Sequence, residues 1–447
     1  MNDFTRGNET KSIFFFALPM LIGSVFQQLY NICDTIIVGQ FLGKDAMAAV
    51  SSSGSIMFLI ISLLSGIGIG FSILVSQYFG SKDMKKVKMT IDTIYVFIFF
   101  GSIIFSIFGI IMSKPLLNLI NTPPNILDQS KLYLNIIFGG LIFSAGYNTV
   151  SSILRGLGDS KTPLYFLIIS TIINIILDII FILVFNMGVE AVSLATIISQ
   201  GVSLLCSMIY LNKKHDILKF NLKNIIFDKD IFKQGLHLGL PSGIQQTLFS
   251  VGAIAVQSLI NEFGVDAIAA GGICYKIEDF IALPIMNLGS ATSTFVAQNV
   301  GAREFERVKK GVLASIKISA IMCFISFIIL MLFSDNLIKF FNTDLEVIRI
   351  GSINLKITAP FFIFIGISFI LNNAMRGAGD SIFPLISSML SLWIIRVPFA
   401  YLFSRHFGIH GVYMGIVFAW FVGALISGIY FLKGKWREKI VINEIFD

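Results

Sequence analysis

Apolar residues fill twelve long stretches of this sequence, and polar residues gather in the short segments between them. A helix that crosses the hydrocarbon core of a bilayer needs ~20 mostly apolar residues, and each stretch is at least about that long. The pattern therefore predicts an all-α integral membrane protein with twelve transmembrane helices. The predicted spans are residues 12–35, 46–77, 90–112, 132–154, 162–185, 189–211, 234–261, 267–299, 311–333, 350–374, 382–404 and 409–432.

Basic residues in the connecting segments predict the orientation of the chain. If the N-terminus lies in the cytoplasm, 23 of the 33 Lys and Arg residues fall on the cytoplasmic side, 6 on the opposite side and 4 within helices. Lys and Arg are enriched in the cytoplasmic loops of membrane proteins. We therefore predict a multi-pass protein of the cell (inner) membrane with both termini in the cytoplasm.

The overall composition agrees with this interpretation. Hydrophobic residues make up 55% of the 447 residues and charged residues 13%, which is about half of the ~25% that is usual in soluble domains. A net charge of +7 would suggest nucleic acid as a partner of a soluble protein. Here the loops account for the basic residues, so the lipid bilayer is the expected partner and no nucleic-acid partner is expected.

Several short motifs occur twice, 221 residues apart. RGLGDSKTP at 155–163 matches RGAGDSIFP at 376–384, and QYFGSKDMKKVK at 77–88 matches QNVGAREFERVK at 298–309. The chain is therefore predicted to contain two copies of one six-helix unit. Because six is an even number, both copies insert with the same orientation, as parallel transporter repeats do.

The longest polar connection marks the predicted boundary between the copies. We assign 1–211 to an N-terminal six-helix lobe, 212–233 to a cytoplasmic linker, 234–433 to a C-terminal six-helix lobe and 434–447 to a cytoplasmic tail. In the repeated RGxGDxxxP loops, the glycines are predicted to end one helix, the aspartate to cap the next and the proline to lie in its first turn. These loops are interpreted as architecture.

A carboxylate in the first span is the main candidate for function. Gln27, Asn31 and Asp34 are spaced i, i+4 and i+7, so on a helix they form one polar stripe. A charged residue at the centre of a bilayer costs roughly 3 kcal/mol on insertion scales and usually marks an ion or substrate pathway. Pro19, in the same helix, removes a backbone hydrogen bond and is a candidate hinge.

Three further spans of the N-terminal half carry polar faces. Asn174 and Asp178 share one face of the fifth span, Thr196 lies in the sixth and Asn148 in the fourth. Oxygen donors around two carboxylates suit a hard cation such as Na+, and neighbouring carboxylates can instead share a proton. The predicted cation site is formed by Asp34 and Asp178, with Gln27, Asn31, Asn174, Thr196 and Asn148 as neighbours.

The repeat makes these acids specific to one lobe. At a spacing of 221 residues, Asp34 corresponds to Ala255 and Asp178 to Phe399. An acid that only stabilised the six-helix unit would be expected in both copies. The asymmetry therefore favours ion binding over the alternative role, a hydrogen bond between packed helices.

Together these motifs resemble the multidrug and toxic compound extrusion (MATE) transporter family. The resemblance covers essentially the whole chain. It rests on two six-helix bundles, on the RGxGDxxxP loops after helices 4 and 10, on QxxGxxxxxxVK after helices 2 and 8, and on the first-helix pattern LPMLIGSVFQQLYNICDTIIVGQFLG. It implies two lobes around a central cleft and export of amphipathic, mostly cationic drugs, dyes or toxic compounds by alternating access, in exchange for Na+ or H+.

The branch of the family that this chain resembles has its cation site in the N-terminal lobe. The acids that this branch uses on helices 1 and 5 match Asp34 and Asp178, and its polar neighbours match Gln27, Asn174 and Thr196. The resemblance implies no cofactor other than the coupling ion, Na+ or H+, and the expected state is a monomer.

Other polar and aromatic side chains are candidates for the cleft. The second large branch of the family carries acidic ligands in helices 7 and 10, where this chain has glutamines in helix 7 and no acid between 350 and 374. A C-lobe cation site of that type is therefore not expected. The residue at 396 could be a counter-ion in the cleft or could hold the lobes together. The candidate cleft or substrate residues are Tyr30, Tyr147, Gln245, Gln246, Glu278, Asp279 and Arg396.

Two other functions were weighed for a polytopic protein of this kind. The main alternative is a flippase for a lipid-linked saccharide precursor. Such proteins tend to have more helices and a basic central cavity, whereas only four basic residues lie within the predicted spans here. An enzyme is not expected, because the four histidines lie in loops or near helix ends and no HExxH or GxSxG motif occurs.

Overall fold

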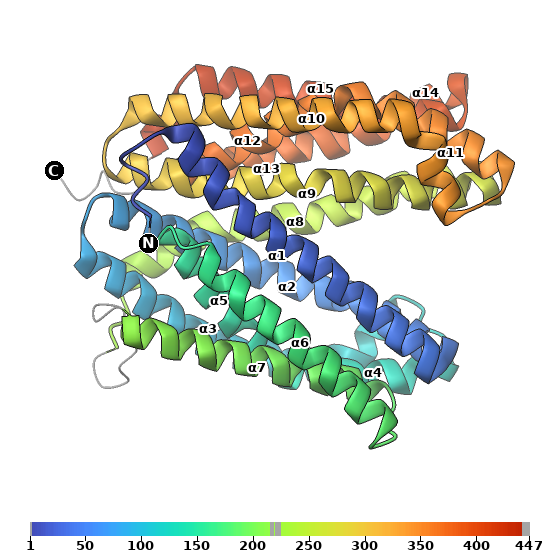
Figure 1. Cartoon of the computed structure of the whole chain (residues 1–447), viewed down its shortest axis with the longest axis horizontal. Helices are drawn as coiled ribbons and strands as arrows, with labels where there is room; N and C mark the ends of the chain where they lie inside the picture. Colours follow the sequence, from blue (N-terminus) through green and yellow to red (C-terminus); the bar gives the residue numbers. More distant parts are fainter. Residues whose placement is uncertain (1, 215–218, 220–224, 440–447) are drawn as a thin grey trace. The chain divides into compact units, whose positions relative to one another are not determined.

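The computed structural model describes residues 2–214, 219 and 225–439, so the predicted linker 212–233 and tail 434–447 lie partly outside the described residues. Every regular element in this part of the chain is a helix (Figure 1). Ten helical segments of it are long and apolar enough to cross a membrane, or up to eleven if a pair bent by 52° is counted as one span. The chain is therefore an all-helical, multi-pass membrane protein.

The helices of the N-terminal half follow one another through short turns. The bent pair is α4 and α5, which meet at Gly140. The elements are α1 (Glu9–Ile37), the π-helical turn η1 (Val38–Leu42), α2 (Gly43–Gly80), α3 (Met84–Leu119), α4 (Pro124–Gly139), α5 (Leu141–Gly156), α6 (Lys161–Leu183) and α7 (Val189–Lys214).

The C-terminal half has the same order of long helices, with more interruptions. A 3-10 turn separates α11 from α12, and a π-helical turn separates α13 from α14. The elements are α8 (Lys229–Asn261), α9 (Val265–Gly301), α10 (Phe305–Phe341), α11 (Leu345–Thr358), η4 (Ala359–Phe361), α12 (Phe362–Ala378), α13 (Ile382–Met389), η5 (Leu390–Arg396), α14 (Val397–Phe407), α15 (Ile409–Leu432) and η6 (Lys435–Lys439).

The internal repeat is present in the backbone as well as in the sequence. Gly43 and Gly264 have φ angles of 83° and 89°, and Lys82 and Arg303 have φ angles of 64° and 61°. Both pairs are separated by the 221 residues of the sequence repeat. A positive φ is uncommon for a residue with a side chain, so its recurrence at Lys82 and Arg303 shows that the two loops have the same conformation.

The RGxGDxxxP loops have the architecture that the sequence predicts. Gly158 and Gly379 both have a positive φ, of 79° and 113°, where the preceding helix has ended. Asp159 and Asp380 each accept a hydrogen bond from the backbone N–H three residues later, at 3.0 and 3.1 Å. The prediction that these loops end one helix and cap the next is confirmed.

The first glycine of each loop motif allows two helices to approach closely. A Cβ atom added to Gly156 on α5 would lie 2.8 Å from the carbonyl oxygen of Ser72 on α2. A Cβ added to Gly377 on α12 would lie 2.3 Å from the carbonyl oxygen of Ser293 on α9. Membrane helices commonly use small residues at such contacts, and the same contact is built in both halves.

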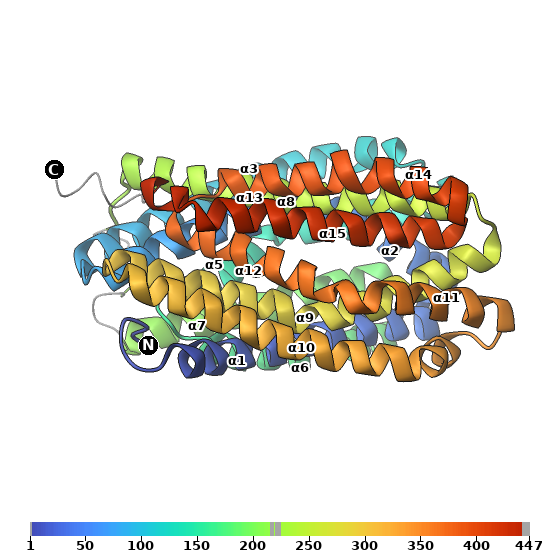
Figure 2. The same cartoon turned by 90° about the horizontal axis from the view of Figure 1, so that it is seen from above.

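Equivalent helices pack together in the two halves. Helix α2 contacts α3, α4 and α5, and helix α7 contacts α4, α5 and α6. In the same way α9 contacts α10, α11 and α12, and α15 contacts α11, α12 and α14. Figures 1 and 2 show α9, α10, α12 and α15 side by side along their length.

Two compact units divide the chain in an unexpected place. One contains Pro19–Gly243 and the other contains Asp3–Leu18 together with Ile244–Asp447. The division therefore falls inside two helices, directly before the predicted hinge Pro19 in α1 and two residues after Pro241 in α8. The predicted lobe limits stay a prediction beside this division.

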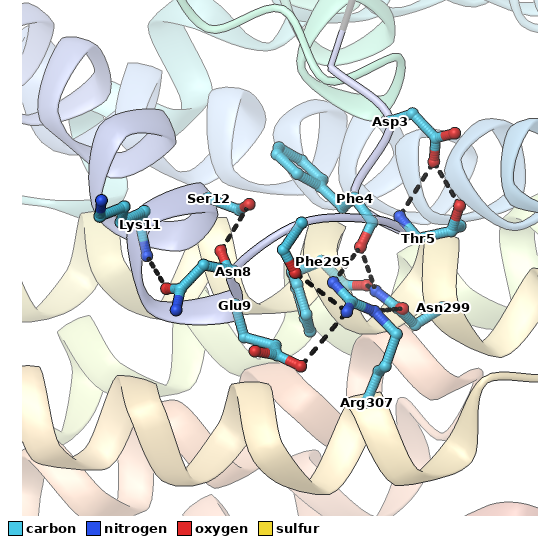
Figure 3. A network of polar contacts seen from close by, with 11 residues as sticks. Asp3, Phe4, Thr5, Asn8, Glu9, Lys11, Ser12, Phe295, Asn299 and Arg307 are labelled. Carbon is cyan, nitrogen blue, oxygen red and sulfur yellow. Dashed lines mark hydrogen bonds and ion pairs between the residues drawn. The ribbon is translucent and has the colours of Figure 1, made fainter.

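The N-terminal segment is fixed to the second unit by one arginine (Figure 3). Arg307 on α10 donates hydrogen bonds to the backbone carbonyls of Phe4 and Gly7, both at 3.1 Å. It also pairs with the carboxylate of Glu9 at 3.2 Å and donates to the Oδ1 of Asn299 at 3.2 Å. The guanidinium thus uses several of its five donors to hold the segment that leads into α1.

Candidate functional site

Two acidic residues of the first unit come together inside it. Asp178 on α6 is fully buried (0% exposed), and Asp34 on α1 is partly buried. Their carboxyl groups act on each other electrostatically. Two carboxylates this close to each other cannot both stay charged unless a cation or a shared proton compensates them. The pair is therefore the centre of the candidate site.

Hydroxyl groups from other helices surround the pair. The hydroxyl of Tyr30, one turn before Asp34 on α1, lies 3.0 Å from the Oγ1 of Thr196 on α7, and either atom can donate. Tyr30 and Tyr133, the latter on α4, interact electrostatically with both acids. Helices α1, α4, α6 and α7 thus all contribute to one polar cluster, which we call the acid-pair cluster: Tyr30, Asp34, Tyr133, Asn174, Asp178 and Thr196.

The sequence of α6 explains why its polar residues point inward. Asn174 and Asp178 are one turn apart and both are 0% exposed. The apolar residues between and beside them are Ile172, Ile176 and Ile179, which are 53%, 50% and 42% exposed. In a bilayer an apolar face can meet lipid, whereas a carboxylate must find partners within the protein. The helix therefore turns its polar face to the interior of the unit.

Several polar atoms of this cluster have no hydrogen-bond partner in the described part of the chain. They are both carboxylate oxygens of Asp178, one of Asp34 and both amide atoms of Asn174. A buried polar group without a partner costs about 1–3 kcal/mol, so such a group is uncommon where stability alone is at stake. Carboxylate, amide and hydroxyl oxygens are the ligands that hard cations prefer. The donor set fits Na+ or, through a shared proton, H+.

Three residues of the predicted site lie outside the contacts of this cluster. Gln27 and Asn31 are exposed side chains on α1, so the predicted stripe divides into an exposed part and the partly buried Asp34. Asn148 is also exposed, and its amide donates to the carbonyl oxygen of Ser144 in its own helix at 2.9 Å. Spacing along a helix identified these residues but could not separate neighbouring faces of the same helix.

Two of the predicted cleft residues are engaged within their own units. Tyr147 is 9% exposed and donates to the carbonyl oxygen of Pro163 at 3.1 Å. Gln245 is 5% exposed, donates to the carbonyl oxygen of Pro384 at 3.2 Å and is also bonded to Arg376. Both side chains therefore have partners that tie helices together. The neighbouring Gln246 is partly buried.

The other predicted cleft residues lie in the second unit. Glu278 on α9 is partly buried and accepts a hydrogen bond from the hydroxyl of Thr358 at 2.8 Å. Asp279 is also partly buried. Arg396 ends the π-helical turn η5, and its guanidinium interacts electrostatically with Glu278. The structure thus brings Glu278 and Arg396 together, outside the acid-pair cluster.

Sequence reasoning missed Tyr133. It lies near the start of the predicted fourth span, and no spacing relates it to Asn148, the polar residue on which that span was judged. A tyrosine in an apolar run is most often a packing residue with a polar end. Only the approach of α4 to α1 and α6 gives its hydroxyl a role, and that approach is a tertiary feature.

The equivalent place in the second unit has no acid. Asp178 corresponds to Phe399, whose ring centroid lies 4.6 Å from that of Phe418 and 5.7 Å from that of Phe403. Asp34 corresponds to Ala255, which is partly buried on α8. The second unit therefore fills with aromatic side chains the position where the first unit has a carboxylate.

Comparison with known proteins assigns the chain to a family. The model of the MatE family matches it twice, over residues 19–180 and 241–402. The chain belongs to the MATE family of transporters. The two matches follow the two copies of the sequence repeat, so each six-helix half is one MatE module. The family consists of transporters and not of enzymes, as the sequence predicts.

Curated relatives match the MATE chain from end to end. The "Probable multidrug resistance protein YpnP" of Bacillus subtilis (strain 168) is 31% identical over 442 residues, which are 99% of each chain. The "Probable multidrug resistance protein YoeA" of the same organism is 33% identical over 444 residues, covering 97% of this chain and 96% of the relative. The "Multidrug export protein MepA" of Staphylococcus saprophyticus is 25% identical over 439 residues, covering 97% of this chain and 96% of the relative.

Solved structures of MATE proteins share the fold. A structure described as "Crystal structure of MATE in the bent conformation" gives a TM-score of 0.91 at 24% identity and covers 97% of this chain and 98% of that one. A structure of a "multidrug resistance MATE family transporter of the MOP superfamily" in an outward-facing conformation gives 0.90 at 24% identity, over 97% of this chain and 98% of that one. The predicted all-helical MATE fold is confirmed.

Proposed function

We propose that this MATE protein is a cation-coupled antiporter that exports amphipathic, mostly cationic drugs or toxic compounds by alternating access. The observation that carries the proposal is the buried pair of Asp34 and Asp178. Three of their four carboxylate oxygens lack a partner among the described residues, and their counterparts in the second unit are apolar. The names of the curated relatives, which are multidrug resistance and multidrug export proteins, support the export of drugs.

The coupling ion, Na+ or H+, is proposed to bind between the two carboxylates. Asn174 and Thr196 would add neutral oxygens from α6 and α7, and the hydroxyl of Tyr30 would hold Thr196 in position. Gln27, Asn31 and Asn148 stay predicted neighbours of this site. This arrangement places the ion in the N-terminal lobe and assigns the chain to the branch of the family with that property.

Ion and drug are proposed to compete through the conformations that they stabilise. A ligand shifts a conformational equilibrium only by its difference in affinity for the two states. An ion that neutralises the acid pair removes the repulsion that otherwise holds α1 and α6 apart, and so favours the state in which these helices are close. A cationic drug would then bind best to the other state. Pro19, next to the division between the two units in α1, is the proposed hinge.

The topology of the chain is proposed to follow the sequence prediction in full. The longest candidate span, Glu9–Gly80, has 72 residues, far more than the ~20 that one crossing needs, and the positive φ of Gly43 lies in its middle. Counting it as two crossings, and α4 with α5 as one, gives twelve spans. Both termini would lie in the cytoplasm, and the protein would act as a monomer.

Transport by purified protein in liposomes tests the proposed function. We expect efflux of a lipophilic cationic dye under an inward Na+ gradient or an inward H+ gradient, imposed one at a time. Only one of the two gradients should drive it, which identifies the ion. Asp128→Asn, which changes an exposed acid on α4, is the control variant and should transport normally. Dye movement that neither gradient affects would overturn the proposal.

A further inference from the structure

Arg396 is a charged residue inside a span, and its guanidinium has no hydrogen-bond partner among the described residues. It lies within Ile382–Phe407, a candidate membrane span. Its Nε is buried and has no partner, and in the same part of the chain its guanidinium forms no ion pair. Arginine in a bilayer is costly and nearly always meets an anion, a carbonyl or a water-filled path. The guanidinium is therefore available to a ligand.

The groups around Arg396 do not neutralise it. Glu278 on α9 faces it electrostatically, as do the hydroxyl groups of Tyr275 on α9 and Tyr413 on α15. The carboxylate of Glu278 instead accepts a hydrogen bond from Thr358 at 2.8 Å, and no ion pair joins it to Arg396 within the described residues. The structure thus holds an acid and a base near each other but apart, each with charge to spare.

The backbone at Arg396 is also particular to the second unit. Arg396 ends η5, a π-helical turn over Leu390–Arg396. The corresponding stretch 169–175 lies in α6, which is α-helical throughout, and the residue at the position of Arg396 is Ile175. Single π-helical turns often occur at functional sites. The repeat therefore does not impose either the turn or the arginine.

We propose that Arg396 and Glu278 form a binding site for zwitterionic compounds, in which Arg396 binds the carboxylate of the compound and Glu278 its cationic group. This inference rests on the proposed export of amphipathic compounds and adds a substrate class to it. A guanidinium presents two parallel N–H donors that match the two oxygens of a carboxylate. Glu278, held by Thr358, supplies the opposite charge at a short distance.

A pair of dyes that differ in one group tests this site. Rhodamine 110 carries a free carboxylate and is a zwitterion, whereas rhodamine 123 is its methyl ester and is a plain cation. Binding of each dye to the purified full-length protein is followed by fluorescence anisotropy. In Arg396→Gln, the Kd for rhodamine 110 is expected to rise by about tenfold or more, as the loss of a charge-assisted hydrogen bond requires. The Kd for rhodamine 123 should change by less than about twofold.

A double variant separates ligand binding from an internal role. If Arg396 served only to balance Glu278, the neutral pair in Glu278→Gln/Arg396→Gln would restore the affinity for rhodamine 110. We expect no restoration, and we expect Arg396→Lys to keep only part of the affinity because lysine lacks the planar fork. Restoration, or an equal loss of both dyes in Arg396→Gln, would overturn the site.

The binding assay also keeps this inference distinct from the proposed function. Binding is measured without an ion gradient, so a protein that exports neither dye under Na+ or H+ gradients would refute the antiporter while leaving the test of Arg396 intact. In the opposite case, ion-driven efflux of rhodamine 123 together with equal binding of rhodamine 110 by wild type and Arg396→Gln would refute the site alone.

Discussion

The hydroxyl of Tyr30 lies 3.0 Å from the Oγ1 of Thr196, and this contact ties α1 to α7 beside the two buried acids. It is a direct side-chain hydrogen bond through which α1 meets the polar interior of the first unit. Tyr30 is one turn from Asp34 on the same helix, so a movement of α1 that separates Tyr30 from Thr196 also moves Asp34 relative to Asp178. The contact therefore reports the state of the acid pair.

Tyr30→Phe should weaken binding of the coupling ion without unfolding the protein. The variant removes one hydrogen bond, whose net value is about 1 kcal/mol, and about a fivefold rise in the ion concentration needed for half-maximal efflux follows. Thr196→Val removes the other partner and should give a similar rise. The double variant should be no worse than either single one, because both remove the same contact. Tyr165→Phe, at a tyrosine on α6 that is 60% exposed, should behave as wild type.

Asp178→Asn should abolish ion-driven efflux and leave the protein at least as stable as before. Both carboxylate oxygens of Asp178 lack hydrogen-bond partners among the described residues, and a neutral amide removes the repulsion between it and Asp34. Sites kept for function are often not optimised for stability, so we expect the Tm in detergent to stay level or rise. A marked fall in Tm would indicate that Asp178 is a structural residue. Asp34→Asn should also abolish efflux.

Much of the fold was predictable because it depends on local signals. The apolar stretches have the length of a bilayer, and the caps at Asp159 and Asp380 depend on residues within one turn of them. The repeat spacing could be read from short motifs and recurs in the backbone at Gly43 and Gly264. These features need no knowledge of which helix lies beside which.

The site was predictable only in part, because it is made by helices far apart in the sequence. A carboxylate in a span is conspicuous on its own, so Asp34 and Asp178 could be paired from composition and the repeat. Tyr133 has no such signal, and its role appears only when α4 packs near α1 and α6. Tyr147 looked like a cleft residue, yet its hydroxyl bonds to the backbone of Pro163.

Arg307→Ala should release the N-terminal segment from the second unit. Its guanidinium binds the carbonyl oxygens of Phe4 and Gly7 and the carboxylate of Glu9, and alanine replaces none of these contacts. Limited digestion with trypsin should then cut at Lys11 several times faster than in wild type. The released segment adjoins Pro19 through α1, so efflux should also slow.

The matched control for Arg307 is a basic residue nearby on α10. Lys309 pairs with Glu306 at 2.7 Å, and their side chains are 49% and 75% exposed. Exposed pairs of this kind contribute little to stability, so Lys309→Ala should leave the rate of cleavage at Lys11 unchanged. If Arg307→Ala and Lys309→Ala are digested at the same rate, the N-terminal segment does not depend on the contacts of Arg307.

Alanine at the first glycine of either loop motif should destabilise its unit. At Gly377 the new Cβ would lie 2.3 Å from the carbonyl oxygen of Ser293, and at Gly156 it would lie 2.8 Å from that of Ser72. Both contacts are with backbone, which cannot swing aside, so α12 must move from α9, or α5 from α2, at a cost of about 1–3 kcal/mol. Gly377→Ala should lower the Tm more than Gly156→Ala because its contact is shorter. Gly428→Ala, on α15 with nothing within 4 Å of the new Cβ, should leave the Tm level or raise it slightly, since alanine favours a helix over glycine. Equal Tm values for Gly377→Ala and Gly428→Ala would mean that close contact of the helices at the repeated motif does not hold the bundle together.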